Sequence, residues 1–275
     1  MFPLSGAHYI ESNKQHDNER FRRLGQFMYE LSGTVTIASP VSIVRHEIEM
    51  AFMRALPFRI QPAAFTLLGK GVGHAIGMPD VGPVARDPTG LVPREKVEAL
   101  QKLARDSFEQ SVLTGCFPWD TTPQPRGRPD FSQHDKNFLA EMYDFRKRLD
   151  TDDKDLKERA IYANVMVTML DELNEIRERH GIPFNVFEQM GIEGVTAFLE
   201  DMPSVRVNIH LRRQWLANAR LQGRANDRND WFYLGAAAAH CDVLVAEKHF
   251  AGLVNRPGLV KRATVITDLR DLPRV

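Results

Sequence analysis

The sequence predicts an α/β fold in which short strands near both ends of the chain form a parallel sheet. Short β-rich runs occur at residues 34–37, 243–245 and 263–267. Between residues 93 and 179 apolar positions recur at helical spacing instead. We therefore expect residues 1–56 and 203–275 to form one core, with residues 57–202 as a large all-helical insertion.

The composition is that of an ordinary globular protein. The chain has 275 residues, of which 43% are hydrophobic and 26% charged, and its formal net charge is zero. Because the net charge is zero, the overall composition does not indicate nucleic-acid binding. Any such binding would have to come from a local cluster of basic residues. The two cysteines lie far apart, which favours a reducing compartment. No apolar run approaches the ~20 residues of a membrane span, and no signal-peptide pattern is present. We expect a cytoplasmic protein without a membrane partner.

The first residues predict a strand that turns into a helix. Residues 1–5 read as a short buried strand, Ser5 is a plausible N-cap, and Glu11 falls one to two turns inside the helix. A domain that starts directly on a core strand has often lost an element ahead of it. Residues 17–31 then show helical spacing up to Ser32-Gly33.

A further helix opens at Ser39-Pro40 and carries Glu47 and Glu49 among apolar residues as far as Leu56. The glycine-rich residues 68–77 look like a phosphate loop, but they follow no clear strand and lack a Gly-Lys-Ser/Thr ending. A flexible loop is favoured there, with a phosphate contact by Lys70 left open.

The middle of the chain is expected to be helical. Helices are predicted over residues 93–113, 132–149 and 152–179, and a proline-rich surface loop over residues 117–129. A longer helix should run from Met202-Pro203-Ser204 to about Gly223. It carries a group of basic residues: Arg206, Arg212, Arg213, Arg220 and Arg224. These arginines form either a solvated helix face or a ridge that follows phosphates beside a metal site.

Two acids mark the start of the next helix. Asp227 and Asp230 stand at i and i+3, so they share one face at a helix N-terminus, where the helix dipole favours negative charge. Capping alone would need only one of them. The helix leads into the apolar strand 243–245, which is consistent with a central parallel strand. Ligands bind outside the carboxyl ends of such strands. Glu247 lies at that end and is the better metal candidate, whereas Asp242 lies at the opposite end and is more plausibly structural.

Three segments carry a resemblance to a known family. They are Ser5-Gly6-Ala7-His8-Tyr9-Ile10-Glu11, Asn226-Asp227-Arg228-Asn229-Asp230, and Cys241-Asp242-Val243-Leu244-Val245-Ala246-Glu247-Lys248. In this order and spacing they resemble the PIN-like nucleases, and in particular a subfamily of uncharacterised bacterial PIN-like proteins. The resemblance covers residues 1–55 and 203–275. The family's first strand, which ends in an Asp, should precede Phe2. Its absence implies either a start site assigned too far downstream or the loss of one acid.

The resemblance implies a three-layer PIN-like core and a metal-dependent phosphodiesterase that acts on RNA. It implies that Glu11, Asp227, Asp230 and Glu247 are the catalytic residues and the ligands of Mg²⁺ or Mn²⁺. Arg212, Arg213, Arg220 and Arg224 would then contact substrate phosphates. Glu47 substitutes for Glu11 in a shifted alignment, and His8 is either a site residue or a partly buried histidine.

Two other functions remain open at this stage. One is a catalytically inactive PIN-like module that binds nucleic acid or a protein, including a second copy of itself. The other is an unrelated helical enzyme or regulator whose acids serve as helix caps.

Overall fold

The computed structural model shows a mostly helical protein with short strands, which confirms a mixed α and β composition. It describes residues 2–15, 17–56, 60–78, 80–84, 86–87, 91–115, 132–149, 153–218, 223, 227–255, 259 and 263–274. The proline-rich segment 117–129 lies outside these residues. The chain divides into two compact units, each made of two segments. Unit 1 comprises Met1–Ser39 and Thr66–Asp130, and unit 2 comprises Pro40–Phe65 and Phe131–Val275. These limits differ from the boundaries expected at residues 56 and 202.

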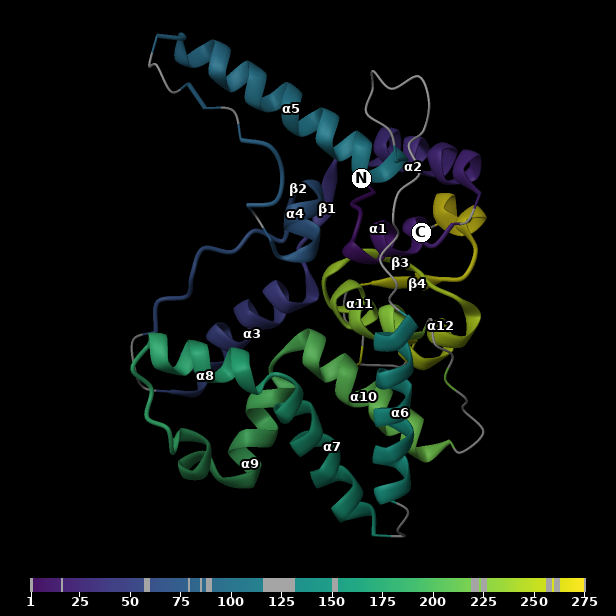
Figure 1. Ribbon diagram of the computed structural model, residues 1–275. Coiled ribbons are helices and arrows are strands. Elements are labelled where there is room, and N and C mark those ends of the chain that lie inside the picture. The colour runs from purple at the N-terminus through teal and green to yellow at the C-terminus, as the bar shows by residue number, and fades with distance from the viewer. Residues whose placement is uncertain are drawn as a thin grey trace. The chain divides into compact units, whose positions relative to one another are not determined.

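Unit 1 combines helices with a small antiparallel strand pair. Its elements are α1 (Gly6–Asn13), α2 (Asn18–Ser32), β1 (Val35–Ile37), β2 (Leu68–Lys70), α4 (Gly71–Ile76) and α5 (Arg94–Thr114) (Figure 1). β1 pairs antiparallel with β2, and Leu4 forms an isolated parallel bridge with Thr36. The strand expected at residues 1–5 is therefore present only as this bridge.

Local signals account for the ends of α2. The Asp17 carboxylate accepts the backbone N–H groups of Glu19 and Arg20, which caps the start of the helix. Gly33 adopts a left-handed conformation, with φ of 56°, and ends it. Helix α2 packs on α5 so closely that a Cβ atom on Gly25 would lie 2.0 Å from the Leu113 carbonyl oxygen. Glycine at position 25 is thus a requirement of this packing.

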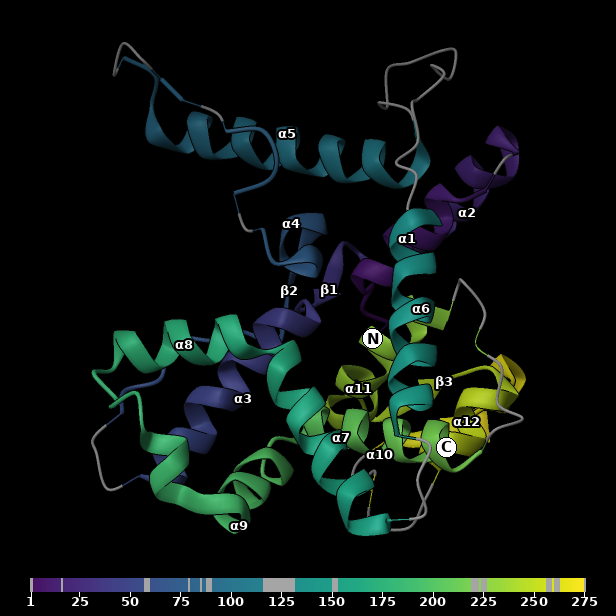
Figure 2. The same ribbon diagram turned by 60° about the horizontal axis from the view of Figure 1, so that its bottom comes forward.

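Unit 2 contains the longer series of helices and a parallel strand pair (Figures 1 and 2). Its helices are α3 (Pro40–Ala55), α6 (Ser132–Arg148), α7 (Lys154–Thr168), α8 (Leu170–Arg179), α9 (Val186–Glu200), α10 (Pro203–Ala217), α11 (Asp227–His240) and α12 (Lys248–Val254). The remaining elements are β3 (Val243–Val245), β4 (Thr264–Ile266) and the 3-10 helix η1 (Leu269–Arg274).

The expected strand 243–245 is parallel, but it is not a central buried strand in the part of the chain that the structure describes. There, β3 pairs with β4 alone, and Val245 is exposed. The expected helix over residues 152–179 is also divided. Met169 has φ of −126° and ψ of 23°, which ends α7 and separates it from α8. Apolar spacing continues across this break, so the spacing alone predicts one helix.

Two apolar clusters hold unit 2 together. In the first, α8 and α9 contact α3 around buried Phe52, Leu173 and Leu199 (Figure 2). In the second, Trp215 of α10 and Trp231 of α11 meet edge to face, with ring centroids 6.3 Å apart. None of the described helices combines the length and the apolar composition that a bilayer span requires.

Candidate functional site

The two acids at the start of α11 lie where the sequence places them. The helix begins at Asp227 and has both Asp227 and Asp230 in its first turn. Asp227 is half-buried and Asp230 is exposed. At this helix end the unpaired backbone N–H groups and the helix dipole stabilise negative charge. The arrangement therefore places two carboxylates on one face of the first turn of α11.

Glu247 follows the parallel strand pair directly. β3 ends at Val245, the N–H of Ala246 donates to the Ile266 carbonyl at 3.0 Å, and Glu247 is the exposed N-cap of α12. Leu234 and Ala238 of α11 share an apolar cluster with Leu244 and Val265 of this pair. Asp242, at the other end of β3, contributes its carbonyl to Thr264 N–H at 2.8 Å.

The lengths of these elements limit how closely the acids approach one another. Helix α11 has 14 residues, a length of about 20 Å, whereas a three-residue strand spans about 10 Å. Within the described residues, no group of three or more His, Cys, Asp or Glu side chains is arranged to hold a metal ion. Carboxylates have the hard oxygen donors that Mg²⁺ and Mn²⁺ require. The donor chemistry thus fits, but these residues form no assembled coordination sphere.

Glu11, the remaining expected ligand, belongs to unit 1. It lies in the last turns of α1, and its carboxylate accepts an ion-pair hydrogen bond from Lys14 Nζ at 2.8 Å. The neighbouring His8 accepts the Ser5 backbone N–H at Nδ1, 2.9 Å away, which completes the cap of α1. Asp227, Asp230 and Glu247 belong to unit 2.

Among the expected phosphate-binding arginines, Arg212 is buried. It lies on α10 with 7% of its surface exposed. Its Nε donates to Asn208 Oδ1 at 3.1 Å, and its guanidinium also donates to Asn164 Oδ1. This side chain is enclosed by unit 2 and does not form part of a surface ridge.

Arg213, the next residue, is held by a different set of partners. Its Nε donates to Glu158 at 2.8 Å, and a terminal nitrogen lies 2.6 Å from the Tyr162 hydroxyl and 3.3 Å from Glu200. Arg220 and Arg224 lie outside the described residues. The two arginines that can be placed are thus both engaged within the chain.

Glu47, the alternative to Glu11, is a buried carboxylate at the meeting point of three helices. It lies on α3 and accepts the backbone N–H and the hydroxyl of Ser204, the latter at 2.8 Å, as well as His240 Nε2 at 2.8 Å. Ser204 is in the first turn of α10, so the carboxylate stabilises that helix end. Ser204 and His240 both contact Glu47 rather than each other, and no nucleophile–base pair results.

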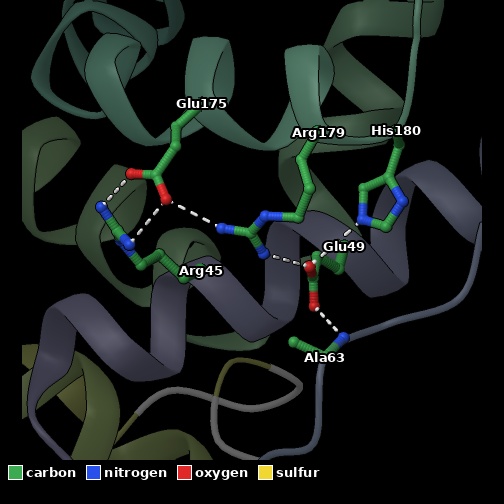
Figure 3. Close-up of polar contacts among 6 residues, drawn as sticks. All are labelled: Arg45, Glu49, Ala63, Glu175, Arg179 and His180. Atoms are coloured by element: carbon green, nitrogen blue, oxygen red, sulfur yellow. Dashed lines mark hydrogen bonds and ion pairs between the residues drawn. The ribbon is translucent and has the colours of Figure 1, made fainter.

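A second buried carboxylate on the same helix lies in a polar cluster that joins α3 to α8. Glu49 is 3% exposed and accepts hydrogen bonds from Arg179 at 2.9 Å, from His180 Nε2 at 3.2 Å and from the Ala63 backbone N–H at 2.8 Å (Figure 3). An arginine, a histidine and a backbone amide thus surround one acid. This matches the rule that a buried charge is paired and hydrogen-bonded.

The cluster continues to the surface through Glu175. This exposed side chain accepts hydrogen bonds from Arg179 at 2.8 Å and from Arg45 at 3.1 Å (Figure 3). Sequence reasoning notes Glu49 only as a member of an amphipathic helix. The signal that could have singled it out is an acid flanked by the fully buried Ile48 and Phe52.

The glycine-rich segment of unit 1 is ordered by a carboxylate of the protein. Strand β2 leads into α4 at Gly71, and Glu109 accepts the Val72 N–H at 2.8 Å and lies 3.4 Å from the Tyr9 hydroxyl. A Cβ atom on Gly71 would lie 2.4 Å from that carboxylate. Burial is the main reason why the pKa of Glu109 is raised. Glu109 thus occupies the place that an anion would take in a phosphate loop, and Lys70 is exposed.

Comparison with protein-family models, with curated proteins and with solved structures finds no match to this chain.

Proposed function

We propose that the chain is a PIN-like phosphodiesterase that hydrolyses RNA with Mg²⁺ or Mn²⁺. The observation that supports this function is the sequence of elements at the end of unit 2. A helix with Asp227 and Asp230 in its first turn shares an apolar cluster with a parallel strand pair, and Glu247 follows β3 directly. When bound, the metal would supply a hydroxide and stabilise the charge on the phosphate.

In this proposal the chain's own residues hold the ion. Asp227 and Asp230 bind it from the start of α11, and Glu247 binds it from the end of β3. Glu11, which the resemblance adds to this set, belongs to unit 1, and the proposal for unit 2 rests on the other three acids. Glu47 is the less suitable replacement, because Ser204 and His240 already bind its two oxygens.

The proposal is tested by calorimetric titration of Mn²⁺ into the protein and into Asp230→Asn. We expect the native chain to bind Mn²⁺ and the variant to lose binding, together with loss of Mn²⁺-dependent cleavage of a labelled single-stranded RNA. Asp242→Asn is the matched control, since it removes an exposed acid from the opposite end of β3 and should leave both properties unchanged. Equal Mn²⁺ binding by Asp230→Asn and the native chain would refute the assignment.

The second candidate function is a non-catalytic module that binds nucleic acid or a protein, including a second copy of this chain. For such a module, the contacts of Arg212 and Arg213 favour a protein partner over nucleic acid, because both guanidinium groups are held by groups of the same chain. Such a module would bind RNA or a partner with the same affinity with and without Mn²⁺, and would leave the RNA intact.

A further inference from the structure

Unit 2 contains a partly open cavity of about 240 Å³ between α3, α6, α7, α10 and α11. Most of its wall is apolar, and the principal side chains are Val41, Val44, Phe138, Met142, Val205 and Trp231. Ligand pockets for drug-sized molecules span ~300–1,000 Å³. The volume of this cavity therefore suits a smaller molecule with a predominantly apolar body.

One cation lines this apolar cavity. Arg212 is buried, and its bonded partners are the amide oxygens of Asn164 and Asn208 and the thioether sulfur of Met142, all of which are neutral. Within the described part of the chain, Arg212 forms no ion pair with a carboxylate. Burial lowers the pKa of Arg212 to about 10, so its surroundings penalise the positive charge.

Buried cations in proteins are normally matched by an anion within contact distance. Glu49 shows that pattern in the same unit, where Arg179 and His180 surround one carboxylate. Among the described residues, Arg212 has neutral hydrogen-bond partners, and Glu141 acts on it only from beyond ion-pair distance. The Nε and Nη1 of Arg212 donate to these partners, which leaves the donors of Nη2 for a ligand carboxylate.

The acidic side chains of the cavity limit how many negative charges a ligand can carry. Glu141 and Glu172 also line it, and the negative charge of Glu141 partly offsets the effect of burial on Arg212. Neither carboxylate lies within ion-pair distance of Arg212, but both disfavour a doubly charged anion by like-charge repulsion. A single negative charge is therefore preferred to a phosphate dianion.

We propose that this cavity binds a small monocarboxylate with an apolar body, its carboxylate on Arg212 and its hydrocarbon part against Trp231 and Val44. The site is separate from the proposed metal ligands and does not depend on phosphodiesterase activity. A medium-chain fatty acid or an arylalkanoic acid has the required chemistry.

The first experiment compares three probes with the same hydrocarbon chain on the native protein, by isothermal titration calorimetry. We expect octanoate to bind with a stoichiometry of one, and octanol and octyl phosphate to bind more weakly. Equal affinity for octanol and octanoate would overturn the role of Arg212. Tighter binding of octyl phosphate would overturn the monocarboxylate assignment. An undetectable heat for octanoate, together with no shift of its resonances in ligand-observed NMR, would overturn the site.

The second experiment removes the cation. Arg212→Gln should weaken octanoate binding by about thirtyfold or more and leave octanol binding nearly unchanged. Unchanged octanoate binding by a folded Arg212→Gln would contradict the proposal.

A third experiment keeps the site testable if Arg212→Gln does not fold. Val41 lines the cavity with 48% of its surface exposed, so Val41→Phe should fill part of the volume and weaken octanoate binding without disturbing the core. Val167→Phe is the matched control, because Val167 is exposed on α7 and does not line the cavity. Equal effects of the two substitutions on octanoate binding would contradict the site.

Discussion

The two units bury a glutamate in different ways. In unit 1, Glu109 accepts a backbone N–H and lies near a phenol hydroxyl, both of them neutral groups. In unit 2, Glu49 accepts a backbone N–H as well, but it is also paired with Arg179 and His180. The first arrangement leaves the cost of desolvation on the carboxyl group, which raises the pKa of Glu109. The second offsets that cost with opposite charge.

The consequence is that the two units depend on different interactions. Unit 2 has two large apolar clusters and a polar cluster that joins α3 to α8, so loss of one charge there should leave other charges unpaired. Unit 1 has a smaller apolar cluster and a close backbone contact between α2 and α5. A substitution that adds volume between α2 and α5, or a change of pH, should therefore lower the stability of unit 1 more directly than that of unit 2.

The largest expected effect comes from Glu49→Gln. This change keeps the shape of the side chain but removes the charge that Arg179 and His180 share, so we expect a loss of about 3 kcal/mol in the free energy of unfolding of unit 2. Urea unfolding followed by tryptophan fluorescence measures it, because Trp215 and Trp231 both lie in the core of this unit.

Glu175→Gln is the control for that experiment. Glu175 belongs to the same cluster, but its side chain is 48% exposed, and exposed ion pairs contribute less than about 1 kcal/mol. A loss as large as that of Glu49→Gln would show that burial does not decide the difference between these two carboxylates.

An intermediate effect is expected from Gly25→Ala in unit 1. The new methyl group would meet the Leu113 carbonyl oxygen at 2.0 Å, so α2 and α5 must separate, at about 2 kcal/mol. Hydrogen exchange of peptides from the two helices measures the loss. Gly33→Ala is the comparison, with open space around it but φ of 56°, and should cost about 1 kcal/mol through backbone strain. A larger loss of stability from Gly33→Ala than from Gly25→Ala would argue against the close contact between α2 and α5.

The smallest effect, and one that depends on pH, is expected from Glu109→Gln. Because the pKa of Glu109 is raised in the folded state, the folded chain retains a proton that the unfolded chain releases above the ordinary value of 4.5. The stability of the native protein therefore falls as the pH rises through this window. Glutamine has no such proton, so the variant should gain stability relative to the native chain between acidic and neutral pH. Parallel urea titrations across the window would detect this change, and a constant difference would contradict it.

Much of the helical structure could be predicted because its causes are local. Asp17 and Gly33 mark the ends of α2, and apolar spacing places α3 and α5 within one or two residues. β2 and α4 could not be predicted, since a three-residue strand with exposed ends shows no alternation. The glycines that follow it receive their conformation from Glu109, a residue of a distant helix.

The positions of the candidate site residues could be predicted from the sequence only where they follow from neighbouring residues in the chain. The helix-start position of Asp227 and Asp230 and the strand-end position of Glu247 follow from local pattern. The partners of Glu47 do not, because Ser204 lies 157 residues away in the sequence. Whether a buried acid binds a metal or caps a helix is decided by such distant partners.

The division of each unit into two segments has a consequence for how the chain folds. The chain leaves unit 1 after Ser39 and returns at Thr66, and the pairing of Ile37 with Leu68 closes this excursion at its base. Closing a loop of that length costs on the order of 3 kcal/mol of chain entropy. The pairing of β1 with β2 thus fixes both ends of the segment that contains α3. Each unit is made of two separate segments of the chain, so neither unit can be obtained as a single uninterrupted fragment.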